Sequence, residues 1–304
     1  MDYVLQTKEL TKKYKNFQAL DSLTMNVPKG SVYGFVGKNG AGKTTLIRLI
    51  CGFQMPSSGS FTLYGIQNDC RNIVHARRRM GAVVEAPSIY TDMTAEENLK
   101  QQYRILGLPS YDGIPELLKL TGLEQAGKKK AKHFSLGMKQ RLGIAAALAG
   151  SPDFLVLDEP VNGLDPQGIV EIRELILNLN LRYQITILIS SHILDELSRL
   201  ATHYGIIDHG RMVKELTAEE LDSACRKCVR IEVNDTAALA RTLDSMKLDY
   251  KILSDTTADL FARVNVTQLT AALSEENCQV LSITEKDESL ESYYLSLIGG
   301  DSHD

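Results

Sequence analysis

Eight residues near the N-terminus constrain the fold of this chain more than any other stretch: Gly37-Lys38-Asn39-Gly40-Ala41-Gly42-Lys43-Thr44. They fit the pattern G-x-x-x-x-G-K-[ST], in which glycines let the backbone approach phosphate oxygens closely. Residues 31–36 before this loop are typical of a buried strand, and residues 45–50 after it are typical of a helix with an apolar face. Backbone N–H groups and a helix N-terminus then surround an anion. The sequence therefore predicts a phosphate site in an α/β domain.

Lys43 and Thr44 carry the chemistry of this loop. Lys43 is predicted to reach the β- and γ-phosphates of a nucleotide, and the Thr44 hydroxyl is predicted to bind Mg²⁺. A plain glycine turn between a strand and a helix is the alternative interpretation. The match at all four fixed positions, in the right structural context, disfavours it.

Length and composition indicate a globular protein of two domains. The chain has 304 residues, of which 43% are hydrophobic and 24% are charged, as in ordinary soluble proteins. No apolar run approaches the roughly 20 residues that a membrane-spanning helix needs. Residues 1–4 show no signal-peptide pattern. We therefore expect a cytoplasmic protein that reaches a membrane only through a partner.

Charge divides the chain into two parts. Residues 1–214 contain 26 Lys and Arg against 20 Asp and Glu, whereas residues 215–304 contain 8 against 18. A shift of this size predicts a domain boundary near Glu215, and we place the domains at residues 1–218 and 219–304. The acidic second part also disfavours a C-terminal arm that binds nucleic acid.

Residues 219–304 are predicted to form a small α+β domain with the ferredoxin-like order βαββαβ. We expect strands at 229–234, 249–254, 259–265 and 279–285, and helices at 236–246, 267–276 and 289–298. The domain shows no catalytic cluster, so a regulatory or dimerising module is the favoured interpretation. The pair Cys225-x-x-Cys228 lacks the matched ligands of a zinc site, and we interpret the five cysteines as free thiols.

Two carboxylates end an apolar stretch in the first domain. Residues 154–157 read as a buried strand, and Asp158 and Glu159 follow at once. Burying two acidic groups costs free energy unless they bind something, and Mg²⁺ with a polarised water would supply the reason. A second buried strand, residues 185–189, leads to His192 three residues after it ends.

The rest of the first domain alternates strands and helices. Further strands are expected at 3–10, 22–27, 60–64, 82–84, 204–208 and 211–214, and helices at 71–80, 94–106, 112–121, 134–148 and 167–180. Thr94 and Glu97 fit a capping box, and Ser135 is placed to cap the helix that follows it. Tyr14 lies in the turn after the first strand. It is either an exposed loop aromatic or a flat surface on which adenine stacks.

The stretch Phe134-Ser135-Leu136-Gly137-Met138-Lys139-Gln140-Arg141 resembles the signature of ABC-type ATPases, usually L-S-G-G-Q. In that family the P-loop precedes the signature, and a Walker B strand, a D-loop and a switch histidine follow it. The corresponding parts of this chain are residues 37–44, residues 154–159, residues 162–166 and His192, in the same order. The resemblance implies a P-loop ABC ATPase fold with a mostly parallel core sheet, an antiparallel β subdomain and a helical subdomain.

One branch of that family is especially similar. The form of the signature, the lack of a membrane segment and Leu290-Glu291-Ser292-Tyr293-Tyr294-Leu295 resemble the ATPase subunits of drug and peptide-antibiotic exporters, including bacitracin-resistance and lantibiotic-immunity transporters. The resemblance implies an ATP-hydrolysing subunit on the inner face of the cell membrane, which powers export through a separate integral-membrane permease. It also implies a head-to-tail homodimer in the ATP-bound state and no direct contact with nucleic acid.

The resemblance further implies a role for each motif residue. ATP would be bound by Tyr14, Gly37, Lys38, Asn39, Gly40, Ala41, Gly42, Lys43, Thr44 and Thr45. Mg²⁺ would be held by Thr44, Asp158 and Glu85. Glu159 would polarise the attacking water, and His192 would contact that water and the γ-phosphate. Ser135, Gly137 and Asp165 would contact the ATP bound by the partner subunit, as a second helix N-terminus facing an anion.

Glu85 departs from the wider family, which usually carries Gln in the loop after the strand expected here at residues 82–84. Glutamate there is similar to what the lantibiotic-immunity group carries, and a carboxylate can still bind Mg²⁺. Its charge gives it a possible part in coupling hydrolysis to the permease. The alternative is an acidic residue at a strand end that points to solvent.

Two other functions remain open at this point. A soluble ABC ATPase that acts on ribosomes or DNA commonly has two cassettes, or long coiled-coil or zinc insertions, and this chain has one cassette and neither insertion. A P-loop kinase or GTPase would leave the signature and His192 without a role.

Overall fold

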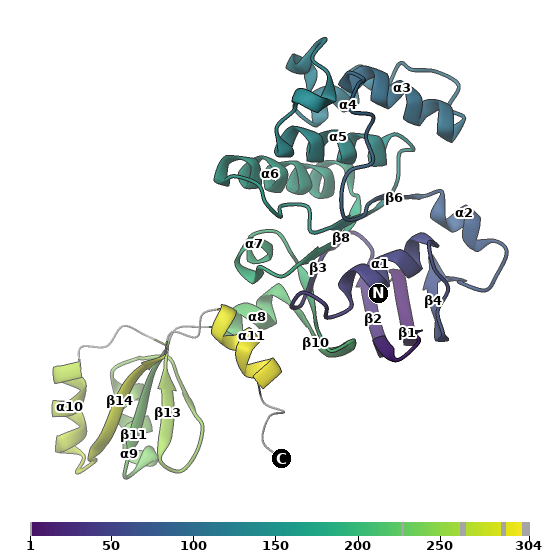
Figure 1. Ribbon diagram of the computed structural model, residues 1–304. Coiled ribbons are helices and arrows are strands. Elements are labelled where there is room, and N and C mark those ends of the chain that lie inside the picture. The colour runs from purple at the N-terminus through teal and green to yellow at the C-terminus, as the bar shows by residue number, and fades with distance from the viewer. Residues whose placement is uncertain (1, 226–227, 262–265, 287–289, 300–304) are drawn as a thin grey trace. The chain divides into compact units, whose positions relative to one another are not determined.

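The computed structural model describes residues 2–225, 228–261, 266–286 and 290–299 (Figure 1). The chain divides into two compact units, Met1–Ala218 and Glu219–Asp304. The division lies just after Glu215, where the charge of the sequence changes sign. Among the helices of the described residues, none has the length and apolar character needed to cross a membrane.

A six-stranded sheet forms the centre of the first unit. In spatial order its strands are β10 (Arg211–Thr217), β9 (His203–Asp208), β3 (Val32–Val36), β8 (Thr186–Ser191), β7 (Phe154–Asp158) and β6 (Met80–Val83). All neighbouring pairs are parallel except β10 with β9. Every residue of β3, β7 and β8 is buried, as expected for central parallel strands that are covered on both faces. The predicted mostly parallel core sheet is confirmed.

A second, antiparallel sheet lies against the first through helix α1 (Lys43–Cys51). Its strands are β2 (Phe17–Pro28), β1 (Tyr3–Tyr14), β4 (Ser58–Leu63) and β5 (Ile66–Gln67), in that spatial order. One apolar core joins the two sheets and α1, with Leu5 from β1, Phe61 from β4, Leu46 and Ile47 from α1, and Phe35 from β3. This core fixes α1, and therefore the loop before it, against the end of β3.

Four helices form the helical part of the unit: α3 (Ala95–Leu106), α4 (Ile114–Leu120), α5 (Leu136–Leu148) and α6 (Pro166–Tyr183). The predicted capping box is present, because Thr94 Oγ1 accepts from the Glu97 N–H at 3.2 Å and Glu97 Oε2 accepts from the Thr94 N–H at 2.8 Å. Two short 3₁₀ turns, Glu124–Ala126 and Ala131–His133, lie in the segment before α5.

Three short helices differ from the prediction. The helix expected at 71–80 is only α2 (Ile73–Arg77), because the chain already enters β6 at Met80. Helices α7 (Leu194–Ser198) and α8 (Ala218–Ala224) were not predicted. Segments of five to seven residues are too short to show a helical repeat of apolar residues, and tertiary contacts therefore decide their conformation.

The second unit contains a four-stranded antiparallel sheet. The elements are β11 (Cys228–Val233), α9 (Thr236–Ser245), β12 (Tyr250–Ile252), β13 (Thr257–Leu260), α10 (Val266–Glu275), β14 (Val280–Lys286) and α11 (Leu290–Gly299). The spatial order of the strands is β12-β13-β11-β14, and α9 and α10 contribute to a separate apolar core. This is the predicted order of elements along the chain, although the end of the strand expected at 259–265 lies outside the described residues. The ferredoxin-like assignment itself stays a prediction.

Candidate active site

The P-loop connects β3 to α1 and requires glycine at two positions. A Cβ atom on Gly37 would lie 2.5 Å from the Ile207 carbonyl oxygen, and one on Gly42 would lie 2.6 Å from the Ala19 carbonyl oxygen. Gly42 also has a φ of +112°, a backbone conformation that strains other residues. The loop therefore packs directly against β9 and the hairpin strand β2, and its conformation is fixed by the fold.

Lys43 turns back over this loop from the first turn of α1. Its ammonium group is buried and donates to the carbonyl oxygens of Gly37 at 2.6 Å and Lys38 at 3.2 Å. The same group lies 3.1 Å from Glu159 Oε1. Thr44 and Thr45 are half-buried in this turn. The tip of the loop, residues 38–40, is exposed, whereas residues 41 and 42 are buried. The arrangement offers a positive charge and a helix N-terminus to a phosphate group.

Asp158 ends β7 as a buried carboxylate with one oxygen unsatisfied. Its side chain is 1% exposed, and Oδ1 accepts from the Ser190 hydroxyl at 2.6 Å. Oδ2 has no hydrogen-bond partner in the part of the chain that the structure describes. An unpaired buried carboxylate oxygen is costly, and a hard cation such as Mg²⁺ would satisfy it. Asp158 and the Thr44 hydroxyl are therefore suited to hold Mg²⁺.

Glu159 lies between a lysine and a histidine. Its Oε2 lies 2.8 Å from His192 Nδ1, while its other oxygen, Oε1, contacts Lys43. Its φ is +49°, an uncommon conformation for a residue with a side chain. Because its own N–H donates to Ser190 Oγ at 2.9 Å, this conformation is held from the neighbouring strand β8. A carboxylate held in this way is suited to orient a water molecule.

Ser190 connects the two carboxylates and was missed by the sequence analysis. It is fully buried, donates to Asp158 and accepts from the backbone of Glu159. The parallel register of β7 and β8 places Ser190 opposite Asp158. The available signal was a hydroxyl at the end of an otherwise apolar strand. Its partner could be identified only once the order of strands in the sheet was known.

Glu196 on α7 is a second residue that sequence reasoning missed. Burial raises the pKa of the Glu196 carboxyl; the nearby His192 opposes this shift, and the charge of Glu159 adds to it. Its Oε2 is buried without a hydrogen-bond partner in the described part of the chain. A second carboxyl group, that of Glu196, therefore lies near Glu159 and His192, and the sequence motif alone did not indicate it.

Tyr14 and Glu85 lie at more exposed positions. The Tyr14 hydroxyl donates to Gln54 just after α1, and Lys12 Nζ lies 5.2 Å from the centre of its ring. Glu85 is 58% exposed, has a φ of +61° and pairs with Arg48 of α1. In the described residues it does not hydrogen-bond the Asp158 group, so its role as a Mg²⁺ ligand stays a prediction.

The three residues predicted to act on a partner's nucleotide are apart from this cluster. Ser135 is exposed and caps α5, because its Oγ accepts from the Met138 N–H at 3.2 Å. Gly137 is half-exposed, and a Cβ there would be 3.8 Å from the nearest side-chain atom. Asp165 is exposed and caps α6, where its Oδ1 accepts from the Gly168 N–H at 3.2 Å. The N-terminus of α5 is thus presented to solvent with its donors directed outward.

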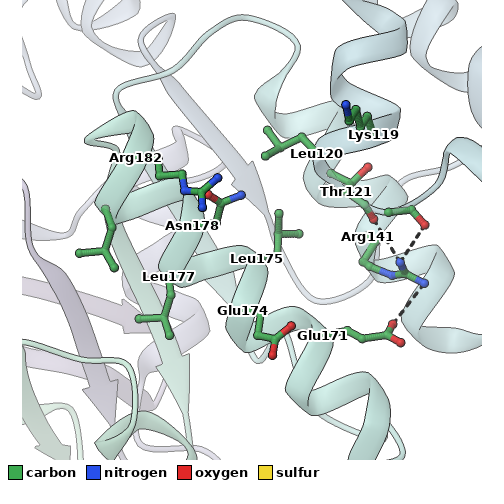
Figure 2. A pocket seen from close by; sticks show the side chains of 12 residues that line it. Lys119, Leu120, Thr121, Arg141, Glu171, Glu174, Leu175, Leu177, Asn178 and Arg182 are labelled. Atoms are coloured by element: carbon green, nitrogen blue, oxygen red, sulfur yellow. Dashed lines mark hydrogen bonds and ion pairs between the residues drawn. The ribbon is translucent and has the colours of Figure 1, made fainter.

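The last residue of the signature has a structural part. Arg141 donates to the carbonyl oxygens of Thr121 at 3.2 Å and Gly122 at 2.9 Å. It also pairs with Glu171 of α6 at 3.3 Å, and dashed lines mark these contacts of Arg141 in Figure 2. These contacts line a hollow of about 510 Å³ between the end of α4, α5 and α6. The hollow contains none of the predicted nucleotide residues. Arg141 therefore ties the signature helix to its two neighbours.

Three features together define an ABC-type ATPase. They are a P-loop on a parallel sheet, a buried Asp158 followed by a half-buried Glu159 beside His192, and a second capped helix N-terminus. Residues 20–162 match the family described as ABC transporter. The bacitracin transport ATP-binding protein BcrA of Bacillus licheniformis is 41% identical and covers 99% of both chains. The lantibiotic transport ATP-binding protein SrtF of Streptococcus pyogenes is 42% identical over 70% of this chain and 90% of its own.

Solved structures agree with this assignment. The cbiO1 protein of Clostridium perfringens, part of the ABC transporter complex cbiONQ, superposes with a TM-score of 0.66 and 28% identity, covering 73% of this chain and 92% of its own. The chain belongs to the ABC transporter family as an ATP-binding subunit. It is an ATPase, and its cofactors are ATP and Mg²⁺.

Proposed function

We propose that this chain powers the export of a bacitracin-like or lantibiotic-like antimicrobial peptide, or a related drug, through a separate integral-membrane permease. The observation that carries the proposal is similarity along the full chain, including the second unit, to two bacitracin transport ATP-binding proteins. The second of these, from Enterococcus faecalis, is 36% identical over 99% of this chain and 98% of its own. The subunit works in the cytoplasm, at the inner face of the cell membrane.

Hydrolysis rests on the cluster around Glu159. The backbone of residues 37–42 and the Lys43 ammonium bind the β- and γ-phosphates, and Tyr14 stacks on the adenine. Thr44 and Asp158 would hold Mg²⁺, which would supply charge neutralisation at these phosphates. Glu159 orients and polarises the attacking water, and His192 holds the Glu159 carboxylate through their 2.8 Å contact. Positioning and charge neutralisation are the main needs of phosphoryl transfer.

The exposed signature completes the site only in a homodimer. Ser135, Gly137 and Asp165 lie on a surface that is open to solvent and make no hydrogen bond to Lys43 or Asp158 in the described residues. In the dimer they face the γ-phosphate bound by the partner subunit, so each ATP is enclosed by two chains. ATP then shifts the dimer toward the closed state by its higher affinity for that state.

This chain offers the permease a docking surface, which includes residues on both sides of Glu85 in the sequence. A hollow of about 740 Å³, called the permease groove below, is lined mainly by β6, the loop at Val84, Ala86 and Pro87, and the ends of α2, α3 and α5. Ile105 and Leu106 both line it and are 68% and 46% exposed. An apolar helical segment from the cytoplasmic side of the permease fits this lining, and Arg78 at its edge favours an acidic residue on that segment.

The second unit acts as a regulatory or dimerising module. It has its own apolar core, a division from the first unit at Ala218 and an excess of acidic residues. Neither the P-loop nor the signature comes from it. A role in controlling the dimer is therefore more consistent with its composition than a second catalytic site.

The test is to identify the partner and to measure protection. Affinity purification of the tagged chain from its own cells should recover a polytopic membrane protein. Cells that express both proteins should resist bacitracin or a lantibiotic, and Lys43→Ala should remove the resistance. Recovery of ribosomes or DNA without a membrane protein would favour the soluble ATPase that the sequence left open. Resistance that persists in the Lys43→Ala cells would contradict the proposed role of this ATPase.

A further inference from the structure

We propose that Arg77 is a positioning residue that links the permease groove to the phosphate-binding end of α1. The inference rests on the proposed function, because it assigns to Arg77 a part in the response of hydrolysis to the permease. Arg77 is the last residue of α2 and lines the permease groove. The same side chain also contacts α1, the helix that begins at Lys43.

The contact with α1 is made at the helix C-terminus. Arg77 Nε donates to the Ile50 carbonyl oxygen at 2.8 Å, and Nη2 donates to the Leu49 carbonyl oxygen at 3.4 Å. The last carbonyl groups of a helix lack intrahelical donors and carry partial negative charge, so a guanidinium group is favoured there. The Arg77 guanidinium carbon also lies 5.9 Å from the ring centre of Phe61 in β4. Arg77 is therefore held between α1 and the antiparallel sheet.

Gly52 shows that the fold reserves space for this guanidinium. It follows α1 with a φ of +84°, and a Cβ there would lie 2.7 Å from Arg77 Cζ and Nη1. Gly52 and Phe53 donate their N–H groups to Leu49 and Arg48, which closes the helix end in the usual glycine-dependent way. A side chain at Gly52 would displace Arg77 from the helix.

Helix α1 connects this contact to the phosphate site. It runs from Lys43 to Cys51, about 13 Å. Rigid secondary-structure elements of this kind carry coupling between sites. The loop next to the permease groove also holds α1, because Glu85, which lies between the lining residues Val84 and Ala86 in the sequence, pairs with Arg48. A permease segment that displaces α2 or the Glu85 loop thus acts on the same helix, and its movement reaches Lys43 and Thr44 at the opposite end.

A purely structural helix cap would have a different effect. Losing the cap lowers the folded fraction and scales all rates together. The ratio of the ATPase rate with permease to the rate without it, here called the stimulation factor, is then unchanged. Loss of a link between groove and α1 lowers this ratio among folded molecules.

The experiment compares three variants in the full-length chain, alone and in proteoliposomes with the permease. Arg77→Ala should lower the stimulation factor at least fivefold while still co-purifying with the permease. Arg77→Lys keeps the charge and one donor, and it should restore part of the factor. Arg71→Ala is the matched control, because Arg71 is an exposed arginine before α2 that does not line the groove. Its factor should equal that of the wild type.

Three outcomes would overturn the proposal. A wild-type stimulation factor in Arg77→Ala would leave Arg77 as a helix cap only. Loss of permease binding in Arg77→Ala would make it a docking residue instead of a link. A wild-type chain whose hydrolysis does not respond to any permease would overturn the proposed function, and this inference with it.

Discussion

Two helix N-termini in the same domain are prepared for an anion in different ways. At α1, Lys43 is buried and contacts Glu159, while Asp158 shares a hydrogen bond with Ser190. At α5, Ser135 is exposed, and its side chain caps its own helix. The first site is a network joined across neighbouring strands, and the second is a surface without a network around it.

The difference shows which half of the catalytic site one chain can complete. The P-loop half draws its residues from the start of α1 and the ends of β7 and β8. Strands β7 and β8 are neighbours in the central sheet, and α1 follows β3 of the same sheet. The signature half offers backbone donors and a hydroxyl with no phosphate ligand of its own. Under the proposed function, one chain would bind and orient ATP at the P-loop half, whereas a second chain would enclose it.

The largest effect is expected at Glu159. Glu159→Gln keeps the shape of the side chain but removes the negative charge that faces the water, so hydrolysis should fall at least about 100-fold while ATP binding is retained. Turnover and equilibrium ATP binding measure this, with Glu116→Gln on the exposed side of α4 as the control. Turnover within about threefold of wild type would remove Glu159 from this role.

The signature half should fail in a way that a second chain can repair. A Cβ at Gly137 would make only ordinary van der Waals contacts, the nearest at 3.8 Å, so Gly137→Asp fits the fold. It places a negative charge before the γ-phosphate, so hydrolysis should fall about 100-fold. Lys43→Ala should also be inactive.

Mixing the two variants should restore about a quarter of wild-type activity, because half of randomly paired dimers are mixed and each has one intact site. An inactive mixture in which mixed dimers are shown to form would contradict composite sites made from two chains.

A smaller effect is expected at Ser190. Ser190→Ala removes a buried hydrogen bond to a carboxylate, worth about 1.5–3 kcal/mol, and turnover should fall about tenfold or more with a raised Mg²⁺ requirement. Titration of activity with Mg²⁺ measures both changes. Ser198→Ala, an exposed hydroxyl on α7, is the control. Equal Mg²⁺ dependence in the Ser190 variant and the wild type would mean that Asp158 is positioned without it.

The smallest effect is expected from removing the second unit. Both halves of the site lie within residues 1–218, so this fragment should unfold cooperatively and bind ATP within about threefold of the full chain. Urea denaturation and calorimetric titration test this. A fragment without a cooperative transition would show that the two units share one core.

Much of the fold could be predicted because its signals are local. The P-loop, the apolar run before Asp158 and the capping box at Thr94 each lie within a few residues, and each is present as expected. Helix α2 was predicted too long, because the basic run before β6 has no apolar repeat to show where a helix ends. Arg77 lies in this basic run, and no local pattern indicates that it caps α1.

The sequence by itself determined the chemistry that is present: a phosphate loop, two carboxylates at a strand end, a histidine and a second helix N-terminus. Only the tertiary structure decided which of these groups meet. Ser190 and Asp158 are 32 residues apart and become partners because β7 and β8 are neighbours in parallel register. Arg48 holds Glu85, 37 residues away, at the edge of the permease groove. The physical reason is that local sequence specifies each helix and strand, whereas the order of strands depends on packing the whole core.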